Sequence, residues 1–460
     1  PRPENNQQNR RPEVKNPGEP GNKLAGIQPE LEAKDAINPS DKSIAELRKL
    51  GFTAAHVMPR GRMLPGQGTL ILLAGDHPDK MILRNQTAMY AQLAGAPRVY
   101  PATVIAVMSK YRELYKQAEQ AKAHEKAYAK NPQGMKRPNY DRALTAFYPV
   151  IDGKMPVFFQ AEDVKSAYRV LALKKELGFP LVIADLKQGW HLIDELKAHK
   201  IPVFLSLDLP SVKEKKKEDK KEEVSEEVAQ LQKRQEEAQK EYFMQAASFE
   251  KAGIEFGLST LSAKSKDIRS NLRKMIEHGL SENTALAALT TVPAKQLGIS
   301  SIVGTVEKGK IANLVVTDKP YFDEESNVRY VFVDGQLFEY EVKEKKKGDP
   351  SKKVDVAGTW SYVVKAPDQE REGTLKIKAD GDELSGTISN PNSGQDGPVD
   401  DLELNGNELS FTTSFNMGPQ TLKLEFNLVI DGDSMEGSVS VGEFGTFDVE
   451  GERSSTPNQF

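Results

Sequence analysis

The feature that most constrains the fold of this chain is a repeated alternation of short apolar runs and amphipathic helical patterns, which begins near residue 155. Continuous apolar strands that alternate with helices are typical of a parallel sheet buried on both faces. Repetition of the unit predicts an α/β fold of the (β/α) TIM-like barrel type, although periodicity alone does not exclude an open sheet. We expect strands at 155–159, 180–184, 201–206 and 254–258, and helices at 163–177, 188–199 and 241–252.

Length and composition limit the classes of protein to which the chain can belong. A chain of 460 residues is too long for one compact core and indicates two or three domains. A net charge of −4 with both signs mixed gives no reason to expect nucleic-acid binding. No apolar run approaches the ~20 residues that a transmembrane helix needs. The absence of cysteine excludes disulfides, thiol catalysis and thiolate metal sites.

Changes in composition along the chain predict its domain organisation. The first segment is rich in Pro, Asn and Gln and cannot bury a core, and a lysine-rich stretch separates the last part of the chain from the rest. The predicted segments are a disordered or surface-wrapping arm at 1–40, the (β/α) barrel at 41–300, β-sandwich strands at 301–342, a linker at 343–354, a small β-barrel at 355–453 and a tail at 454–460.

A charged insertion at 212–240 interrupts the predicted barrel. It is interpreted as a solvated, partly frayed helix, and the alternative is a coiled coil that binds a partner. Val224, Val228 and Leu231 form only one weak apolar stripe, which is too short for a stable coiled coil.

The segment at 358–452 consists of short alternating strands separated by Gly, Asn and Asp turns, without helical signals. This pattern predicts a small antiparallel barrel that closes and so avoids exposed sheet edges. Its opening, Gly358-Thr-Trp360, resembles that of lipocalin-like barrels. Such a barrel either binds an apolar ligand or is filled by its own side chains, and the small size and polar composition favour the filled form.

One tract, residues 278–319, carries a longer resemblance. It contains Val292-Pro-Ala-Lys-Gln-Leu-Gly298 and a Gly304–Leu314 turn and strand, and Tyr330-Val-Phe-Val-Asp-Gly335 follows. These motifs resemble the C-terminal signature of the amidohydrolase superfamily, in particular its imidazolonepropionase-related branch. The resemblance implies a metal-dependent hydrolase with metal ligands at the carboxyl ends of the barrel strands.

The positions that correspond to the family's metal ligands carry other residues in this chain. The resemblance places Gln160 and Asp185 where the family has histidines, after the fifth and sixth strands, and Leu261 where it has the aspartate after the eighth. The His-x-His pair of the family is absent from the sequence. Gln is a weak metal ligand and Leu is none, so we expect a lost metal site, no cofactor and no catalytic residue.

Two functional hypotheses follow. The first is a non-catalytic amidohydrolase-like scaffold or binding subunit, which is a pseudoenzyme. The alternative is an active metal-dependent hydrolase of non-peptide C–N bonds, which requires Zn²⁺ and an intact domain or partner to supply catalysis. A possible pocket is predicted around His56, Arg60 and Gln67, because these residues lie near the end of an early strand and its Gly-rich turn.

The resemblance also implies neighbours outside this chain. Family members build the small β-sandwich from both ends of the domain, and here only the C-terminal strands are apparent from the sequence. We therefore expect a second chain or a missing segment to complete the sandwich and barrel. The family and the Asn/Gln-rich start without Met lead us to expect an exported bacterial protein, periplasmic or at the cell surface.

Overall fold

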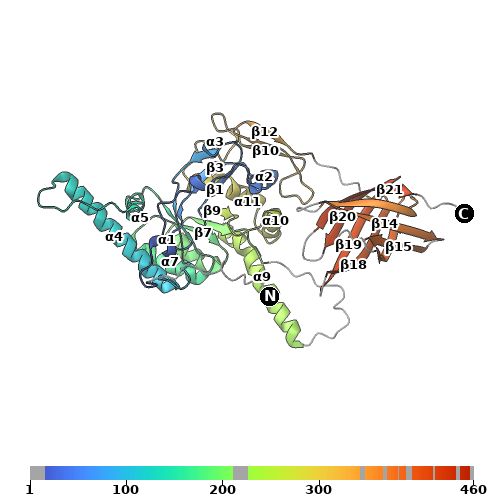
Figure 1. Cartoon of the computed structure of the whole chain (residues 1–460), viewed down its shortest axis with the longest axis horizontal. Helices are drawn as coiled ribbons and strands as arrows, with labels where there is room; N and C mark the ends of the chain where they lie inside the picture. The colour runs from blue at the N-terminus through green and yellow to red at the C-terminus, as the bar shows by residue number, and fades with distance from the viewer. Residues whose placement is uncertain are drawn as a thin grey trace, which may run out of the picture. The chain divides into compact units, whose positions relative to one another are not determined.

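The computed structural model describes residues 16–210, 226–341, 348–365, 370–381, 383–389, 396–417, 420–441 and 446–455. The chain divides into two compact units, residues 1–341 and 342–460, and each is described by itself. Figure 1 shows the helices and strands of both units, coloured along the chain.

The first unit is built on a six-stranded sheet. Its strand order is β2 (Gly66–Gln67), β5 (Met89–Gln92), β6 (Val157–Gln160), β7 (Leu181–Leu186), β8 (Val203–Ser206) and β9 (Phe256–Ser259). Strands β5 to β9 are parallel, and β2 is antiparallel to β5. The predicted α/β class and the predicted strands are confirmed. Within the described residues the sheet stays open, with β2 and β9 at its edges.

Both faces of this sheet are buried, as the continuous apolar strands predict. On β6, Val157 and Phe159 belong to the large core between the sheet and its helices, whereas Phe158 belongs to a smaller apolar cluster on the other face. Strand β7 repeats this division, because Ile183 lies in the large core and Val182 in the smaller cluster. This alternation follows from the two-residue period of a strand.

Helices cover the sheet along the chain. The longer ones are α4 (Val104–Lys130), α7 (Val164–Leu177), α9 (Glu226–Lys251), α10 (Ile268–Glu277) and α11 (Glu282–Leu289). Shorter helices are α1 (Asn22–Ala25), α2 (Lys42–Lys49), α3 (Pro78–Met81), α5 (Arg142–Thr145), α6 (Tyr148–Ile151), α8 (Ile193–Ala198), α12 (Thr291–Gln296) and the 3₁₀ turns η1 (Ala33–Ala36), η2 (Trp190–Leu192) and η4 (Ser265–Asp267). Local signals set the ends of α7, since the Asp163 carboxylate accepts a hydrogen bond from Ser166 N and Gly178 adopts a left-handed conformation. None of the helices in the described part of the chain is long and apolar enough to cross a bilayer.

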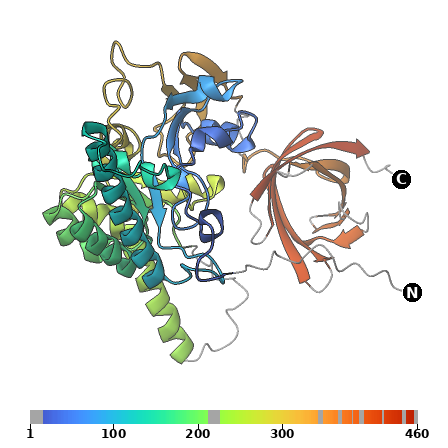
Figure 2. The same cartoon turned by 60° about the vertical axis from the view of Figure 1, so that its left-hand side comes forward.

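The charged insertion continues into a helix. Helix α9 begins at Glu226, well before the expected start at residue 241, and its first part extends away from the body of the unit in both views (Figures 1 and 2). The side chains of residues 233–238 are exposed. The side chains of Val224, Val228 and Leu231, on which the coiled-coil alternative depended, lie outside the described residues.

The small β-sandwich has both of its halves in this chain. One sheet is β1 (Ala54–Val57), β3 (Thr69–Leu72) and β4 (Ile82–Arg84), and the other is β10 (Leu314–Thr317), β11 (Val328–Val333) and β12 (Gln336–Glu339). Leu72 and Ala74 pack against Val328, Val331 and Val333 in one buried cluster. The expectation that the N-terminal half is missing was therefore wrong. The sequence pattern predicts the strands at 54–84 as part of the barrel, because their apolar runs resemble those of barrel strands.

Part of the N-terminal arm packs on the first unit. Ala25, Ile27 and Ala33 are buried, and Ile27 forms a parallel bridge with Leu64. From residue 16 onward the arm is thus attached to the surface, and residues 1–15 lie outside the described part.

The second unit is one antiparallel sheet of nine strands that curls into a nearly closed barrel (Figure 2). Its strands are β13 (Gly358–Lys365), β14 (Glu370–Asp380), β15 (Glu383–Ser389), β16 (Asp396–Pro398), β17 (Asp400–Asn405), β18 (Glu408–Met417), β19 (Gln420–Asp431), β20 (Ser434–Val441) and β21 (Thr446–Ser455). The predicted antiparallel barrel is confirmed. Its interior contains large buried side chains, among them Trp360, Phe411 and Phe426.

The barrel nearly closes because one stretch of chain supplies both sheet edges. Strand β16 pairs with β15, and β17 pairs with β18, yet only Val399 separates β16 from β17. The Thr413 hydroxyl donates to the carbonyl of Pro398 across this seam, at 2.9 Å. On the opposite side the first and last strands pair, with Thr359 facing Ser455.

Candidate functional site

Polar side chains gather where the parallel strands of the first unit end. Because parallel strands end at the same edge of a sheet, residues at or just after their carboxyl ends lie near one another. We call this set the strand-end cluster. It comprises Tyr90 on β5, Gln160 and Glu162 at the end of β6, Asp185 and Lys187 at the end of β7, Asp208 after β8 and Ser262 after β9.

A chain of hydrogen bonds links β5 to β6 within this cluster. The Tyr90 hydroxyl donates to Gln160 Oε1 at 2.6 Å, and Gln160 Nε2 donates to Glu162 Oε1 at 2.9 Å. Burial raises the pKa of Tyr90, and the charges of Asp185 and Glu162 raise it further, so the hydroxyl stays protonated and remains a donor. The Gln160 amide therefore forms hydrogen bonds through both its oxygen and its nitrogen.

Lys187 connects three neighbouring strand ends. Its Nζ lies 2.7 Å from Asp208 Oδ2 and 3.2 Å from Glu162 Oε2. Burial lowers the pKa of Lys187, but the hydrogen bonds to Asp208 and Glu162 outweigh this effect and raise the pKa above its ordinary value. The ammonium group is thus fully charged at neutral pH and has a carboxylate on each side.

Asp185 is the most confined member of the cluster. It is fully buried, its φ of 58° is unusual for a residue with a side chain, and the strand register shifts between Ile183 and Leu186. Its Oδ2 accepts a hydrogen bond from the Ser262 hydroxyl at 2.5 Å. Among the described residues, Oδ1 has no hydrogen-bond partner.

The three positions expected to have lost metal ligands are engaged in other contacts or exposed. Gln160 bonds to Tyr90 and Glu162, Asp185 bonds to Ser262, and the Leu261 side chain is 48% exposed in the loop after β9. Within the described ranges, no group of three His, Cys, Asp or Glu side chains is placed to hold a metal ion. The residues present therefore do not fit the hydrolytic zinc site that the family implies.

The structure gives His56, Arg60 and Gln67 separate environments. His56 Nε2 lies 2.6 Å from the Thr87 hydroxyl, and its ring packs edge-on against Phe158 at a centroid distance of 5.0 Å. Burial lowers the pKa of His56 to about 4. Gln67 is buried and donates from Nε2 to the Pro29 carbonyl at 3.0 Å, whereas Arg60 is exposed. A pocket that combines the three stays a prediction.

Sequence reasoning missed Tyr90, Glu162, Lys187, Asp208 and Ser262. A signal for three of them was present, because Lys187 directly follows the apolar strand β7, and Glu162 and Asp208 come two residues after β6 and β8. Polar residues at these places reach the same sheet edge as the expected ligand positions. Ser262 had no such signal, because the length of the loop after β9 decides where its hydroxyl lies.

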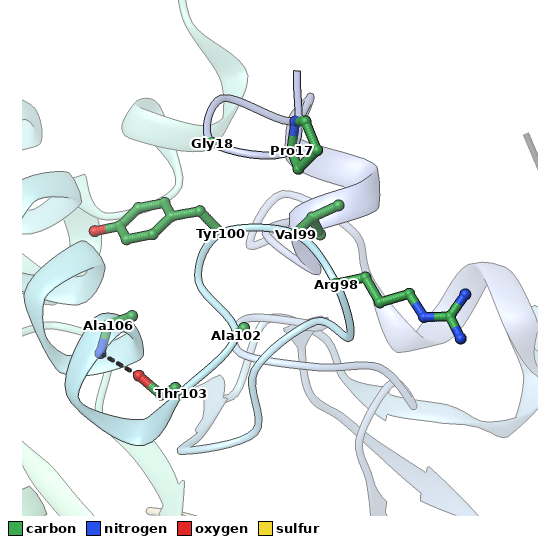
Figure 3. A pocket seen from close by; sticks show the side chains of 8 residues that line it. All are labelled: Pro17, Gly18, Arg98, Val99, Tyr100, Ala102, Thr103 and Ala106. Carbon is green, nitrogen blue, oxygen red and sulfur yellow. Dashed lines mark hydrogen bonds between the residues drawn. The ribbon is translucent and has the colours of Figure 1, made fainter. Parts of the chain in front are cut away.

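A separate surface hollow of about 340 Å³ lies between the N-terminal arm and the start of α4 (Figure 3). Thr103 caps α4 there by accepting a hydrogen bond from Ala106 N at 3.3 Å. The hollow is lined by Pro17, Gly18, Arg98, Val99, Tyr100, Ala102, Thr103 and Ala106. None of these residues belongs to the strand-end cluster.

Comparison with known proteins supports the fold. Residues 183–338, from β7 to β12, match the model of the amidohydrolase family. The structure is similar to that of an amidohydrolase from Thermotoga maritima MSB8, with a TM-score of 0.58 and 22% identity over 68% of this chain and 79% of that one.

Two further solved structures align less closely, and each alignment spans about half of the other chain. One is a prolidase complexed with N-methylphosphonate-L-proline, with a TM-score of 0.32, 20% identity and coverage of 44% of this chain and 50% of that one. The other is a Xaa-Pro dipeptidase with bound methionine, with a TM-score of 0.31, 18% identity and coverage of 45% and 51%. No curated protein sequence matches this chain.

Proposed function

Residues 183–338 match the amidohydrolase family, and from this premise we propose that the chain is a non-catalytic member that acts as a scaffold or binding subunit of a larger amidohydrolase assembly. The observation that carries the proposal is the engagement of Gln160, whose amide bonds to Tyr90 and Glu162 at a position where the family resemblance requires a metal-binding histidine. The Gln160 oxygen already accepts the Tyr90 hydroxyl, and an amide oxygen is a much weaker ligand for Zn²⁺ than the imidazole that it replaces.

The second support for the proposal is the type of residue at the other two expected ligand positions, Leu261 and Asp185. The exposed Leu261 side chain supplies neither a ligand nor a general base that could activate water. Asp185 alone is too few ligands for Zn²⁺, which takes three protein ligands in a catalytic site. A chain with this donor set binds partners or ligands through its framework and carries out no metal-dependent hydrolysis by itself.

The test of this proposal is the metal content of the purified chain, measured by plasma mass spectrometry after incubation with Zn²⁺ and desalting. Less than a tenth of an equivalent of metal, on the order of background, is expected. A parallel assay with N-acyl amino acids and dipeptides should show no hydrolysis above the buffer rate. Stoichiometric zinc together with turnover would contradict the proposal.

The alternative is that catalysis belongs to an intact amidohydrolase domain or partner outside this chain. Within the described residues, β9 has no strand on its outer side, and this favours such a neighbour because an unpaired edge accepts a further strand. Co-purification with an active hydrolase that loses activity when this chain is removed would support this alternative. A catalytically silent chain that purifies alone and monodisperse would count against it.

A further inference from the structure

The disagreement between the strand-end cluster and a metal site has a second consequence. We propose that the ammonium group of Lys187 takes the place of a bound divalent cation, and that this built-in cation holds the ends of β6, β7 and β8 together. The inference rests on the proposed function, because a chain that carries a catalytic metal at these strand ends has no need of the substitute.

The geometry of Lys187 supports this role. Lys187 directly follows β7, which lies between β6 and β8, and its ammonium contacts one carboxylate beyond the end of each neighbouring strand. Both carboxylate oxygens lie within hydrogen-bond distance of the same nitrogen, so one small cation contacts both. The backbone N–H of Lys187 also donates to the Glu162 carbonyl at 2.9 Å, which holds the end of β7 against that of β6.

The charges at this edge require a cation. Glu162, Asp208 and the buried Asp185 carry negative charge here, and Lys187 contributes the positive charge of the strand-end cluster. Like charges at short range repel one another more strongly where water is partly excluded. The Lys187 side chain is only 21% exposed, so its charge is less screened than that of a surface lysine.

Removal of the ammonium should therefore create a weak metal site. In Lys187→Met the two carboxylates keep their positions on rigid strand ends but lose their counterion. Mg²⁺ and Ca²⁺ are hard cations that bind carboxylate oxygens, and they complete their coordination with water. The variant is expected to gain a divalent-cation dependence that the wild-type chain lacks.

The experiment uses the full chain and follows thermal unfolding in EDTA and in millimolar CaCl₂ or MgCl₂. Lys187→Met should lower the Tm in EDTA by about 1–3 °C, because it removes two partly exposed ion pairs. Millimolar divalent cation should recover most of that loss in Lys187→Met and leave the wild-type Tm unchanged. If the variant shows no divalent response, or if the wild type responds equally, the inference is wrong.

Three further variants separate the role of this ion pair from a general effect of charge. Lys122→Met removes a lysine of similar exposure that pairs with Asp152 between α4 and α6, and it should lose stability without gaining a response to divalent cations. Lys187→Met/Glu162→Gln/Asp208→Asn should lose the response, because its carboxylates are gone. Lys187→Arg keeps the charge and should behave like the wild type, which provides a readout even if Lys187→Met fails to fold.

The outcome also distinguishes the two proposals. Stoichiometric zinc in the wild-type chain would contradict the non-catalytic role and remove the premise of this inference. A metal-free wild-type chain whose Lys187→Met variant ignores divalent cations would leave the non-catalytic role intact and refute only the substitution of Lys187 for a metal.

Discussion

The guanidinium of Arg453 lies over the indole ring of Trp360, 4.5 Å from its centroid, and donates hydrogen bonds to the carbonyls of Ala357 and Asp355. The indole N–H in turn donates to the Val356 carbonyl at 2.9 Å. Two residues far apart in the second unit's sequence thus lie in direct contact on its paired first and last strands. The Gly358-Thr-Trp360 motif indicated the start of the barrel. The sequence did not identify Arg453 as the partner of Trp360, because only the pairing of β13 with β21 brings the two residues together.

The planar guanidinium is expected to be essential to this contact. Arg453→Lys keeps the charge but cannot contact two carbonyls and stack on the indole together, so we expect the unit to lose about 1–3 kcal/mol. The measurement is denaturant unfolding followed by Trp360 fluorescence in a Trp190→Phe background, since the chain has two tryptophans. An unchanged midpoint would show that charge alone is sufficient.

The partly buried His56 should make stability depend on pH. Its pKa is lowered by burial to about 4 in the folded chain, whereas an unfolded histidine has a pKa of about 6.5. The unfolded state therefore binds a proton first as the pH falls, so stability is fully present above pH 6.5 and is lost between pH 6.5 and pH 4. By pH 5 the loss should reach about 2 kcal/mol.

The control for this prediction is His56→Gln, which removes the titrating group and keeps a side chain able to hydrogen-bond to Thr87. Unfolding free energies of both proteins are compared at pH 7 and pH 5. The difference between them should shrink by the predicted amount at the lower pH. Parallel curves would assign the acid sensitivity to other groups.

The link between Tyr90 and Gln160 should show energetic coupling. Gln160→Leu leaves the buried Tyr90 hydroxyl without its acceptor, which is expected to cost about 1–3 kcal/mol. Tyr90→Phe in the same background removes the orphaned hydroxyl and should recover part of that loss. A double-mutant cycle measured by urea unfolding should give a coupling of about 1 kcal/mol, and additive losses would mean that the hydrogen bond contributes nothing.

The sandwich offers a matched test of whether its two halves pack within one chain. Leu72→Ala empties a buried site between the two sheets and should cost about 2–4 kcal/mol. Leu337→Ala makes the same change at a side chain that is 50% exposed on β12 and should cost less than about 0.5 kcal/mol. Equal losses in purified monomer would indicate that the sheets do not pack as described.

The fold could be predicted from the sequence where a strand or helix has a clear periodic pattern of apolar residues. The apolar runs from residue 155 onward placed β6 to β9, and the alternation after Gly358 placed the antiparallel barrel. The sandwich half at 54–84 was missed because its sheet is defined by partners more than 200 residues away, as Leu72 against Val331 shows. The local pattern of apolar residues does not show which distant strands a sheet packs against.

The strand-end cluster was predictable at the residues that a family resemblance could align and at polar residues that closely follow apolar strands. Gln160 and Asp185 were placed at the correct sheet edge, whereas Leu261 occupies an exposed loop and its neighbour Ser262 reaches Asp185. Which side chain of a loop turns inward depends on backbone geometry, and the left-handed conformation of Asp185 shows how far it can depart from a regular strand.

The pairing of β13 with β21 makes the second unit a self-contained module. Since Thr359 faces Ser455 across an antiparallel pair, the first and last strands of the sheet lie about 5 Å apart. The sheet of this unit is thus joined through its own first and last strands. A module with this geometry can be gained or lost as a whole without refolding its neighbour.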